Sequence, residues 1–158
     1  MNTNGIGSRA DYRDEEDSAY VALFKSHGAI PIVKGNVPTL CLSLHTQNRI
    51  WGSAENPWNR ERTCGGSSGG DAGLLAANCT QFGMGTDLGG SIRAPASFCG
   101  VYGFLPTARR HTCNGMYAYF LHKVDLRPMS NVMGPMTKNL DDLTYLMKIF
   151  YSQKLFDM

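Results

Sequence analysis

The spacing of apolar residues predicts a helix near each end of the chain. The first helix follows a capping candidate at Asp17 or Ser18 and ends at Gly28. The second begins at Asn139, with two acidic residues in its first turn. Its apolar face comprises Leu140, Leu143, Leu146, Met147 and Phe150. We expect the second helix to belong to the core and to carry no chemistry.

Shorter apolar segments lie between these two helices. Residues 29–33 are typical of a buried strand, although a proline limits hydrogen bonding there, and residues 81–86 and 100–105 are typical of short strands. Residues 71–79 are rich in Ala and Leu and predict a tightly packed helix. Residues 45–66 are polar and broken by Gly and Pro, which predicts a long surface connection. The alternation of helix and strand predicts the α/β class, with a mixed sheet flanked by helices.

Composition narrows the class of protein. The 158 residues suit one domain, 42% of them are hydrophobic, and 18% are charged against a usual value of about 25%. These values exclude a disordered chain, a coiled coil and a collagen. The net charge of +2 comes without a dense block of Lys and Arg, so nucleic acid is not an expected partner.

The cysteines and the N-terminal residues indicate in which kind of cellular compartment the protein is expected. The five cysteines are Cys41, Cys64, Cys79, Cys99 and Cys113. Their odd number and their spacing do not fit a zinc site, and buried free thiols suit a reducing compartment. The first twenty residues are polar and acidic, and no apolar run reaches the roughly 18 residues of a spanning helix. We therefore expect no signal peptide and no transmembrane segment.

Two glycine–serine segments, residues 65–70 and 83–91, contain 8 of the 18 glycines. A flexible linker is one interpretation, but linkers do not have an apolar helix built between them. Glycine beside serine favours a backbone that bends sharply and approaches a ligand closely.

Two chemistries fit these segments poorly. The glycines at 83, 85 and 89 miss the dinucleotide spacing by one residue, and no glycine run is followed by Gly-Lys-Ser/Thr, so phosphate binding is weakly indicated. The run 66–70 satisfies the Gly-x-Ser-x-Gly elbow of α/β hydrolases with Ser68 as nucleophile. That elbow needs an apolar strand before it, and residues 60–64 are not one.

A serine amide hydrolase fits better, with Ser91 as the attacking residue. Successive backbone N–H groups around Leu88, Gly89 and Gly90 can converge on one oxygen and form an oxyanion hole. Ser91 needs a base, and Ser67 in the other segment could relay its proton. A Ser-His-Asp triad stays open as an alternative, with four candidate bases: His27, His45, His111 and His122.

Residues 65–100, GGSSGGDAGLLAANCTQFGMGTDLGGSIRAPASFCG, resemble the defining signature of the amidase signature family. The resemblance implies the partial fold of that family and gives Ser91 the role of nucleophile and Ser67 that of the cis-peptide serine. It makes Leu88, Gly89 and Gly90 the oxyanion-hole segment. It also implies supporting roles, held by Ser68, Asp87 and Arg93.

The flanking segments resemble the fatty-acid amide hydrolase branch more than the glutamyl-tRNA amidotransferase branch. These segments are residues 28–38, Asn56-Pro57-Trp58 and Gly134-Pro135-Met136. The resemblance implies Ser–cis-Ser–Lys hydrolysis of a small amide or ester, including a lipid acyl amide, without metal or cofactor. It implies a cytoplasmic location or one peripheral to an intracellular membrane, and it leaves a homodimer open.

The lysine base of that family has no counterpart in this sequence. Lys34 matches a later strand of the family pattern, so we expect it to be a structural or pocket-edge residue. Residues 1–158 are then expected to be one incomplete amidase signature domain, without the catalytic-lysine strand and the C-terminal half, and with little activity alone. The alternative is a non-catalytic truncated isoform or fragment that acts at most as a binding or interaction module.

Overall fold

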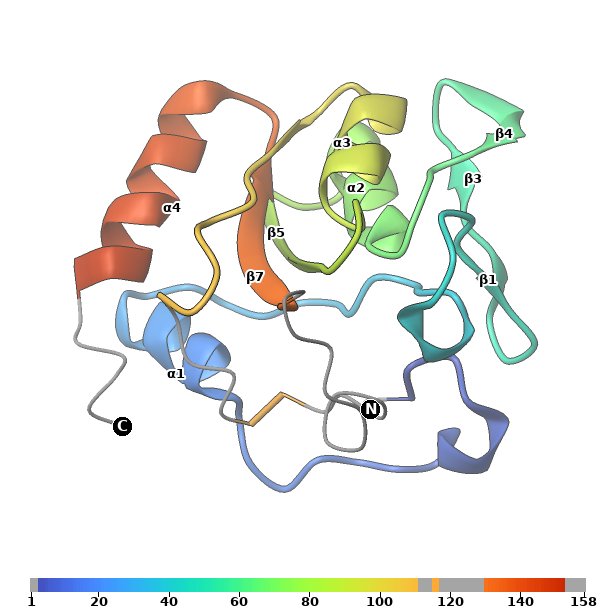
Figure 1. Ribbon diagram of the computed structural model, residues 1–158, viewed down its shortest axis with the longest axis horizontal. Helices are drawn as coiled ribbons and strands as arrows, with labels where there is room; N and C mark the ends of the chain where they lie inside the picture. Colours follow the sequence, from blue (N-terminus) through green and yellow to red (C-terminus); the bar gives the residue numbers. More distant parts are fainter. Residues whose placement is uncertain (1–2, 111–114, 117–129, 153–158) are drawn as a thin grey trace.

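The centre of the molecule is a three-stranded antiparallel sheet with helices on both sides (Figure 1). The computed structural model describes residues 3–110, 115–116 and 130–152. The sheet has the order β5–β7–β6, and its strands are β5 (Phe82–Asp87), β6 (Tyr102–Gly103) and β7 (Val132–Thr137). The helices around it are α1 (Ala19–Ser26), α2 (Gly69–Ala76), α3 (Arg93–Cys99) and α4 (Leu140–Ser152).

Alternation of side chains along the strands creates two apolar layers. Phe82 and Met84 of β5 pack with Met133 of β7 against α1 and α4, whereas Met136 of β7 packs against α2 and α3. Within the first layer, the rings of Tyr20 and Phe150 stack with their centroids 4.8 Å apart. Helices on both faces of one sheet confirm the predicted α/β class.

The structure confirms the helices predicted from apolar spacing. Helix α1 follows Ser18, and Gly28 beyond its end has the left-handed φ of +86° that favours glycine. Helix α4 follows Asn139, whose Oδ1 accepts the backbone N–H of Asp142 at 2.8 Å. The helix predicted over 71–79 is present as α2 but begins two residues earlier, at Gly69.

The prediction of a buried strand at residues 29–33 is wrong. Ile30 and Ile32 are 82% and 68% exposed, and this segment pairs with no strand in the described part of the chain. The next backbone hydrogen bond along the chain is made by Asn36, whose carbonyl accepts the N–H of Gly70 at 3.1 Å. The apolar composition of residues 29–33 was therefore not sufficient to make them a strand of the sheet.

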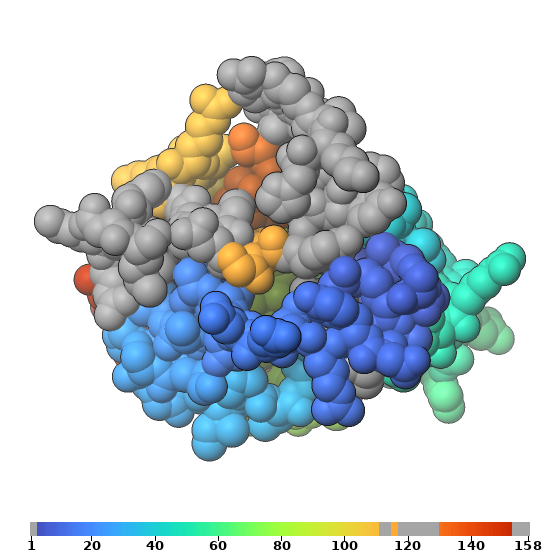
Figure 2. Space-filling view, turned by 90° about the horizontal axis from the view of Figure 1, so that it is seen from below, coloured from blue at the N-terminus to red at the C-terminus, as the bar shows by residue number. Residues whose placement is uncertain are grey.

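The polar connection predicted over 45–66 lies at the surface, but it contains two short hairpins. The strands of the first are β1 (Gln47–Asn48) and β2 (Gly52–Ser53), and those of the second are β3 (Glu55–Asn56) and β4 (Asn59–Thr63). Both hairpins lie at the edge of the molecule opposite α4, where their turquoise to green atoms project at the right of Figure 2. The exposed Trp58 of the second hairpin donates its indole N–H to the carbonyl of Cys99 at 2.7 Å, which anchors this hairpin to the end of α3.

The central strand β7 and helix α3 were not predicted. Gly134-Pro135 resembles a turn in sequence, yet Pro135 stands in the middle of β7 opposite Met84. It has no N–H to donate, but its carbonyl accepts the N–H of Phe104 at 3.1 Å. Two short 3₁₀ turns complete the described elements, η1 (Gly7–Arg9) and η2 (Thr39–Cys41).

Candidate active site

The two glycine–serine segments lie side by side, although the twelve residues 71–82 separate them in sequence. The backbone N–H of Ser68 donates to the carbonyl of Ser91 at 3.0 Å. The Ser68 hydroxyl reaches the carbonyl of Thr86, at the end of β5, at 3.5 Å. Ser67 and Ser68 are buried and Ser91 is half-buried. The fold therefore brings both predicted loops into one site.

The first loop has a conformation that depends on its glycines. The peptide bond between Gly66 and Ser67 is cis, and Gly65 has a φ of +81°. A Cβ on Gly66 would lie only 2.5 Å from the carbonyl oxygen of Ser43. A larger residue at position 66 would therefore displace the backbone that carries Ser67.

Thr46 supports this loop from the hairpin region, a role that the sequence did not suggest. It is fully buried, and its hydroxyl donates to the carbonyl of Gly65 at 2.7 Å and accepts the N–H of Gly69 at 3.2 Å. Its backbone N–H donates to the same Gly65 carbonyl at 3.1 Å. One residue therefore fixes both ends of the segment that holds Ser67. A lone threonine in a polar stretch carries no recognisable motif, so only the contacts reveal it.

The second loop is organised around the Asp87 carboxylate, which is 1% exposed. Arg93 binds it in bidentate fashion, with Nε and Nη2 each 3.0 Å from a carboxylate oxygen. The backbone N–H groups of Gly90 and Ile92 donate to the same carboxylate at 2.6 and 3.0 Å. Burial raises the pKa of Asp87, but the bonds from Arg93 and the backbone outweigh it and lower the pKa to about 2. Asp87 is therefore an ionised support of the turn.

The same contacts restrict which backbone N–H groups the turn can offer to a ligand. The sequence assigned Leu88, Gly89 and Gly90 to an oxyanion hole, but the N–H of Gly90 is directed at Asp87. The N–H groups of Leu88, Gly89 and Ser91 have no hydrogen-bond partner among the described residues. They are the donors of this turn that remain available to an oxyanion.

Asp71, in the first turn of α2, is a further titratable group near the first loop. A Cβ on Gly35 would lie 2.7 Å from Asp71 Oδ2, and one on Gly83 would lie 3.6 Å from Oδ1, so backbone from two segments crowds the carboxylate. Burial raises the pKa of Asp71 to about 7, against a smaller lowering by a backbone hydrogen bond. Asp71 was not singled out from the sequence, although an acidic residue inside an Ala- and Leu-rich helix is a signal that could have indicated it.

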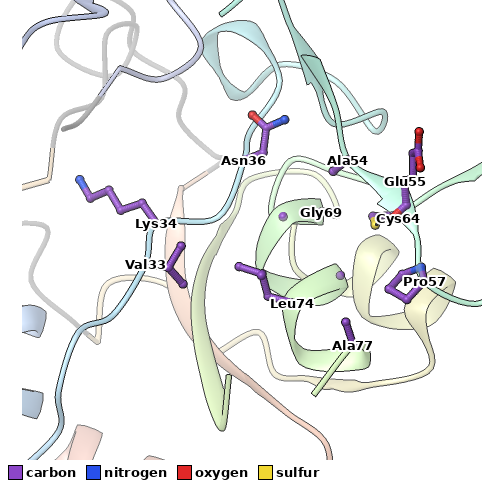
Figure 3. Close-up of a pocket in the computed structure, with 12 residues that line it drawn as sticks. Val33, Lys34, Asn36, Ala54, Glu55, Pro57, Cys64, Gly69, Leu74 and Ala77 are labelled. Atoms are coloured by element: carbon purple, nitrogen blue, oxygen red, sulfur yellow. Dashed lines mark hydrogen bonds between the residues drawn. The ribbon is translucent and has the colours of Figure 1, made fainter. Parts of the chain in front are cut away.

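Three of the four described lysines have partners away from the two loops, and the fourth, Lys148, is exposed on α4. Lys34 lies 3.8 Å from Asp14, and Lys25 and Lys138 hydrogen-bond Asp17 and Asn78 at 2.8 and 2.7 Å. Lys34 also lines a pocket of about 400 Å³, with its ammonium directed away from the other lining residues (Figure 3). This position agrees with the expectation of a pocket-edge residue.

The histidines give the triad alternative no support in the described part of the chain. The ring of His27 lies 3.0 Å from the carbonyl of Leu23, and that of His45 lies 3.4 Å from the hydroxyl of Ser53. His111, His122 and Cys113 lie outside the described residues.

Within the described residues, no three His, Cys, Asp or Glu side chains come together to hold a metal ion. Over the same residues, no helix has the length and apolar character that crossing a membrane requires. The groups that the two loops present are serine hydroxyls, backbone amides and the pair formed by Asp87 and Arg93.

Comparison with known protein families shows to which family the chain belongs. The family described as Amidase matches residues 2–157. The chain belongs to the amidase family. In solved structures the fold of a fatty acid amide hydrolase matches 89% of this chain with a TM-score of 0.82 and 29% identity, and the match covers 24% of that protein. The partial amidase signature fold expected from the sequence is thereby confirmed.

Curated relatives of the chain have different names. The chain is 38% identical over 142 residues to a vitamin D3 hydroxylase-associated protein of Gallus gallus, covering 90% of this chain and 30% of that protein. It is 40% identical over 138 residues to a glutamyl-tRNA(Gln) amidotransferase subunit of Legionella pneumophila, covering 87% of this chain and 27% of that protein. The chain therefore spans less than a third of the length of these relatives.

Proposed function

We propose that the site hydrolyses linear carboxylic amides through an acyl-enzyme on Ser91. The observation that carries this proposal is the contact between the two loops, where the N–H of Ser68 binds the carbonyl of Ser91. This contact places the cis-peptide segment beside a turn with unpartnered N–H groups. Membership of the amidase family supports the same reaction class.

In this mechanism Ser91 Oγ attacks the substrate carbonyl while its proton passes to Ser67, whose own hydroxyl proton passes to a base. The N–H groups of Leu88, Gly89 and Ser91 stabilise the oxyanion. Collapse of the intermediate breaks the C–N bond, and Ser67 delivers the proton to the leaving amine. Water then attacks the acyl group on Ser91 and releases the acid. Asp87, Arg93 and Ser68 keep the turn and the loop in place.

The base that drives this relay is the element we propose to be missing from the 158 residues. Among the described lysines, Lys25, Lys34 and Lys138 are engaged with Asp17, Asp14 and Asn78. The fourth, Lys148, is exposed on α4. We therefore treat the chain as an incomplete amidase signature domain that holds the nucleophile and oxyanion groups. Its turnover of amides is then low, because protonation of a leaving amine needs the complete relay.

For the substrate we propose an amide of a lipid acyl chain, and for the location the cytoplasm or the surface of an intracellular membrane. Similarity to a fatty acid amide hydrolase supports the substrate class. Similarity to the amidotransferase relative supports amide chemistry without a preference for lipid.

A comparison of an activated ester with an amide of the same fatty acid tests this function. A p-nitrophenolate leaves without protonation, so the p-nitrophenyl ester should acylate Ser91, as read by intact mass and peptide mapping. The matching alkyl amide has a poorer leaving group that must also be protonated, so it should react more slowly by at least the roughly 10²–10⁴-fold that general acid–base catalysis usually contributes. Ser91→Ala should abolish acylation, and Ser97→Ala, an exposed serine of α3, should leave it unchanged.

The same experiment distinguishes this function from the alternative, a non-catalytic binding module. The contacts that engage Lys25, Lys34 and Lys138 favour that alternative. Such a module would bind the amide, detected by calorimetry, but would form no acyl adduct with the ester. Acylation elsewhere than Ser91 would also contradict the proposed mechanism.

A further inference from the structure

Two cysteine side chains lie close together next to the candidate site. Cys64 directly precedes the glycine–serine loop, and Cys99 is the last residue of α3. Both are fully buried in the same apolar cluster, where the two thiols are hydrogen-bonded to each other. Cys99 Sγ also lies 3.5 Å from the carbonyl oxygen of Cys64. The proposed hydrolysis uses neither thiol.

The two thiols differ in character. The hydrogen bond from Cys99 lowers the pKa of Cys64, and burial acts against it. The bond to Cys64 and burial both raise the pKa of Cys99. When protonated, the Cys64 thiol donates to the carbonyl of Glu55 at 3.0 Å. Cys64 is therefore the better nucleophile, and Cys99 is the thiol that can react with it in a second step.

Cys64 borders a pocket, although its own side chain is fully buried. It lines the pocket of about 400 Å³ between the β3–β4 hairpin and α2, together with Glu55, Pro57 and Ala77 (Figure 3). A hydroperoxide is small enough to enter such a pocket, and on this proposal it reaches the Cys64 sulfur when the β3–β4 hairpin moves aside. Cys99 is not among the lining residues.

We propose that Cys64 and Cys99 form an oxidation site, at which a hydroperoxide converts the two thiols into a disulfide. The thiolate of Cys64 attacks one peroxide oxygen, the O–O bond breaks, and Cys64 becomes a sulfenic acid as the released hydroxide takes up a proton to form water. Cys99 sulfur then attacks Cys64 sulfur, the S–O bond breaks, and the Cys99 proton leaves with the oxygen as a second water. The two thiols lose two electrons, and hydrogen peroxide gains them.

The disulfide would join the start of one site loop to the helix that follows the other. The two cysteines are 35 positions apart, and the segment between them contains Ser67 and Ser91. Closing this segment restricts the unfolded chain, so the oxidised protein should melt at a higher temperature than the reduced protein.

A variant in which Cys41, Cys79 and Cys113 are replaced by Ser isolates the pair for testing. Treatment with hydrogen peroxide should reduce its intact mass by two hydrogens, link the peptides of Cys64 and Cys99, and raise the melting temperature. A thiol reductant should reverse all three effects. In the unmodified chain, peptide mapping should find the same link, so the test does not depend on the triple variant folding.

Trapping of the sulfenic acid assigns the order of attack. Dimedone should label Cys64 in Cys99→Ser, and it should leave Cys99 unlabelled in Cys64→Ser. Absence of the Cys64–Cys99 link in both the triple variant and the unmodified chain would overturn the proposal. So would dimedone labelling confined to Cys99. Exposed Cys79 provides the internal standard, because it should be oxidised readily without forming this link.

Discussion

Two aspartates near the site have opposite protonation behaviour, although both stand close to glycine-rich loops. Asp87 is held ionised by Arg93 and by backbone N–H groups, with a pKa of about 2. Asp71 is crowded by the backbone of Gly35 and Gly83, and burial raises its pKa to about 7. At the residue scale, hydrogen-bond donors rather than position along the chain decide the charge of each carboxyl group.

The raised pKa of Asp71 predicts a pH dependence of stability. Between about pH 4, the ordinary pKa of Asp, and pH 7, the folded state binds more protons at Asp71 than the unfolded state. Its contribution to the free energy of unfolding is therefore full below pH 4 and is lost as the pH rises to 7. Asp71→Asn should remove this contribution, so the variant gains stability relative to the wild type as the pH rises.

Urea unfolding of both proteins from pH 4 to pH 8 measures this difference. Asp141→Asn on the exposed side of α4 is the matched control and should keep a constant offset from the wild type. A constant offset for Asp71→Asn as well would contradict the account of this carboxyl group.

At the scale of elements, the sequence predicted those whose signals are local. Apolar spacing and the cap at Asn139 fixed α4, and the glycine at position 28 fixed the end of α1. Strand β7 was missed because Gly134-Pro135 is a local turn signal, overridden by pairing with β5. For residues 29–33 the error was the opposite one, since a strand was predicted where none exists. An apolar segment becomes part of a sheet only when it has a partner strand.

The glycine–serine loop depends on a residue outside it, so Thr46 yields a prediction about this element. Thr46→Val keeps the volume but removes the hydroxyl that binds Gly65 and Gly69. The Gly65 carbonyl keeps the backbone N–H of residue 46, but the buried N–H of Gly69 loses its partner. The loss should destabilise the protein by about 1–3 kcal/mol. It should also speed hydrogen exchange of the Gly69 amide and slow the reaction of Ser91 with an activated ester.

Thr46→Ser serves as the control for this prediction, because it retains the hydroxyl. Serine should restore slow exchange at Gly69 and the rate at Ser91, even if the missing methyl lowers the melting temperature. Equal exchange at Gly69 in the Val and Ser variants would show that the hydroxyl does not hold the loop.

At the scale of the whole molecule, the sequence indicated the two loops that meet better than it indicated the fold around them. Ser67, Ser68, Ser91, Asp87 and Arg93 stand in a compact motif, and the fold brings their two loops into contact. The motif could not indicate that Asp87 occupies the N–H of Gly90, nor that Thr46 and Cys64 flank the loop, because these contacts cross between distant segments. The chain matches the amidase fold over most of its length and covers less than a third of its relatives.

Labelling by a fluorophosphonate tests most directly the claim that the two loops assemble Ser91 as a nucleophile. The account predicts a single adduct on Ser91, located by peptide mapping. Ser91→Ala should abolish it, Ser67→Ala should slow it strongly, and Ser97→Ala should not change it. Absence of an adduct from a chain that still melts cooperatively, or an adduct on another serine, would contradict the claim.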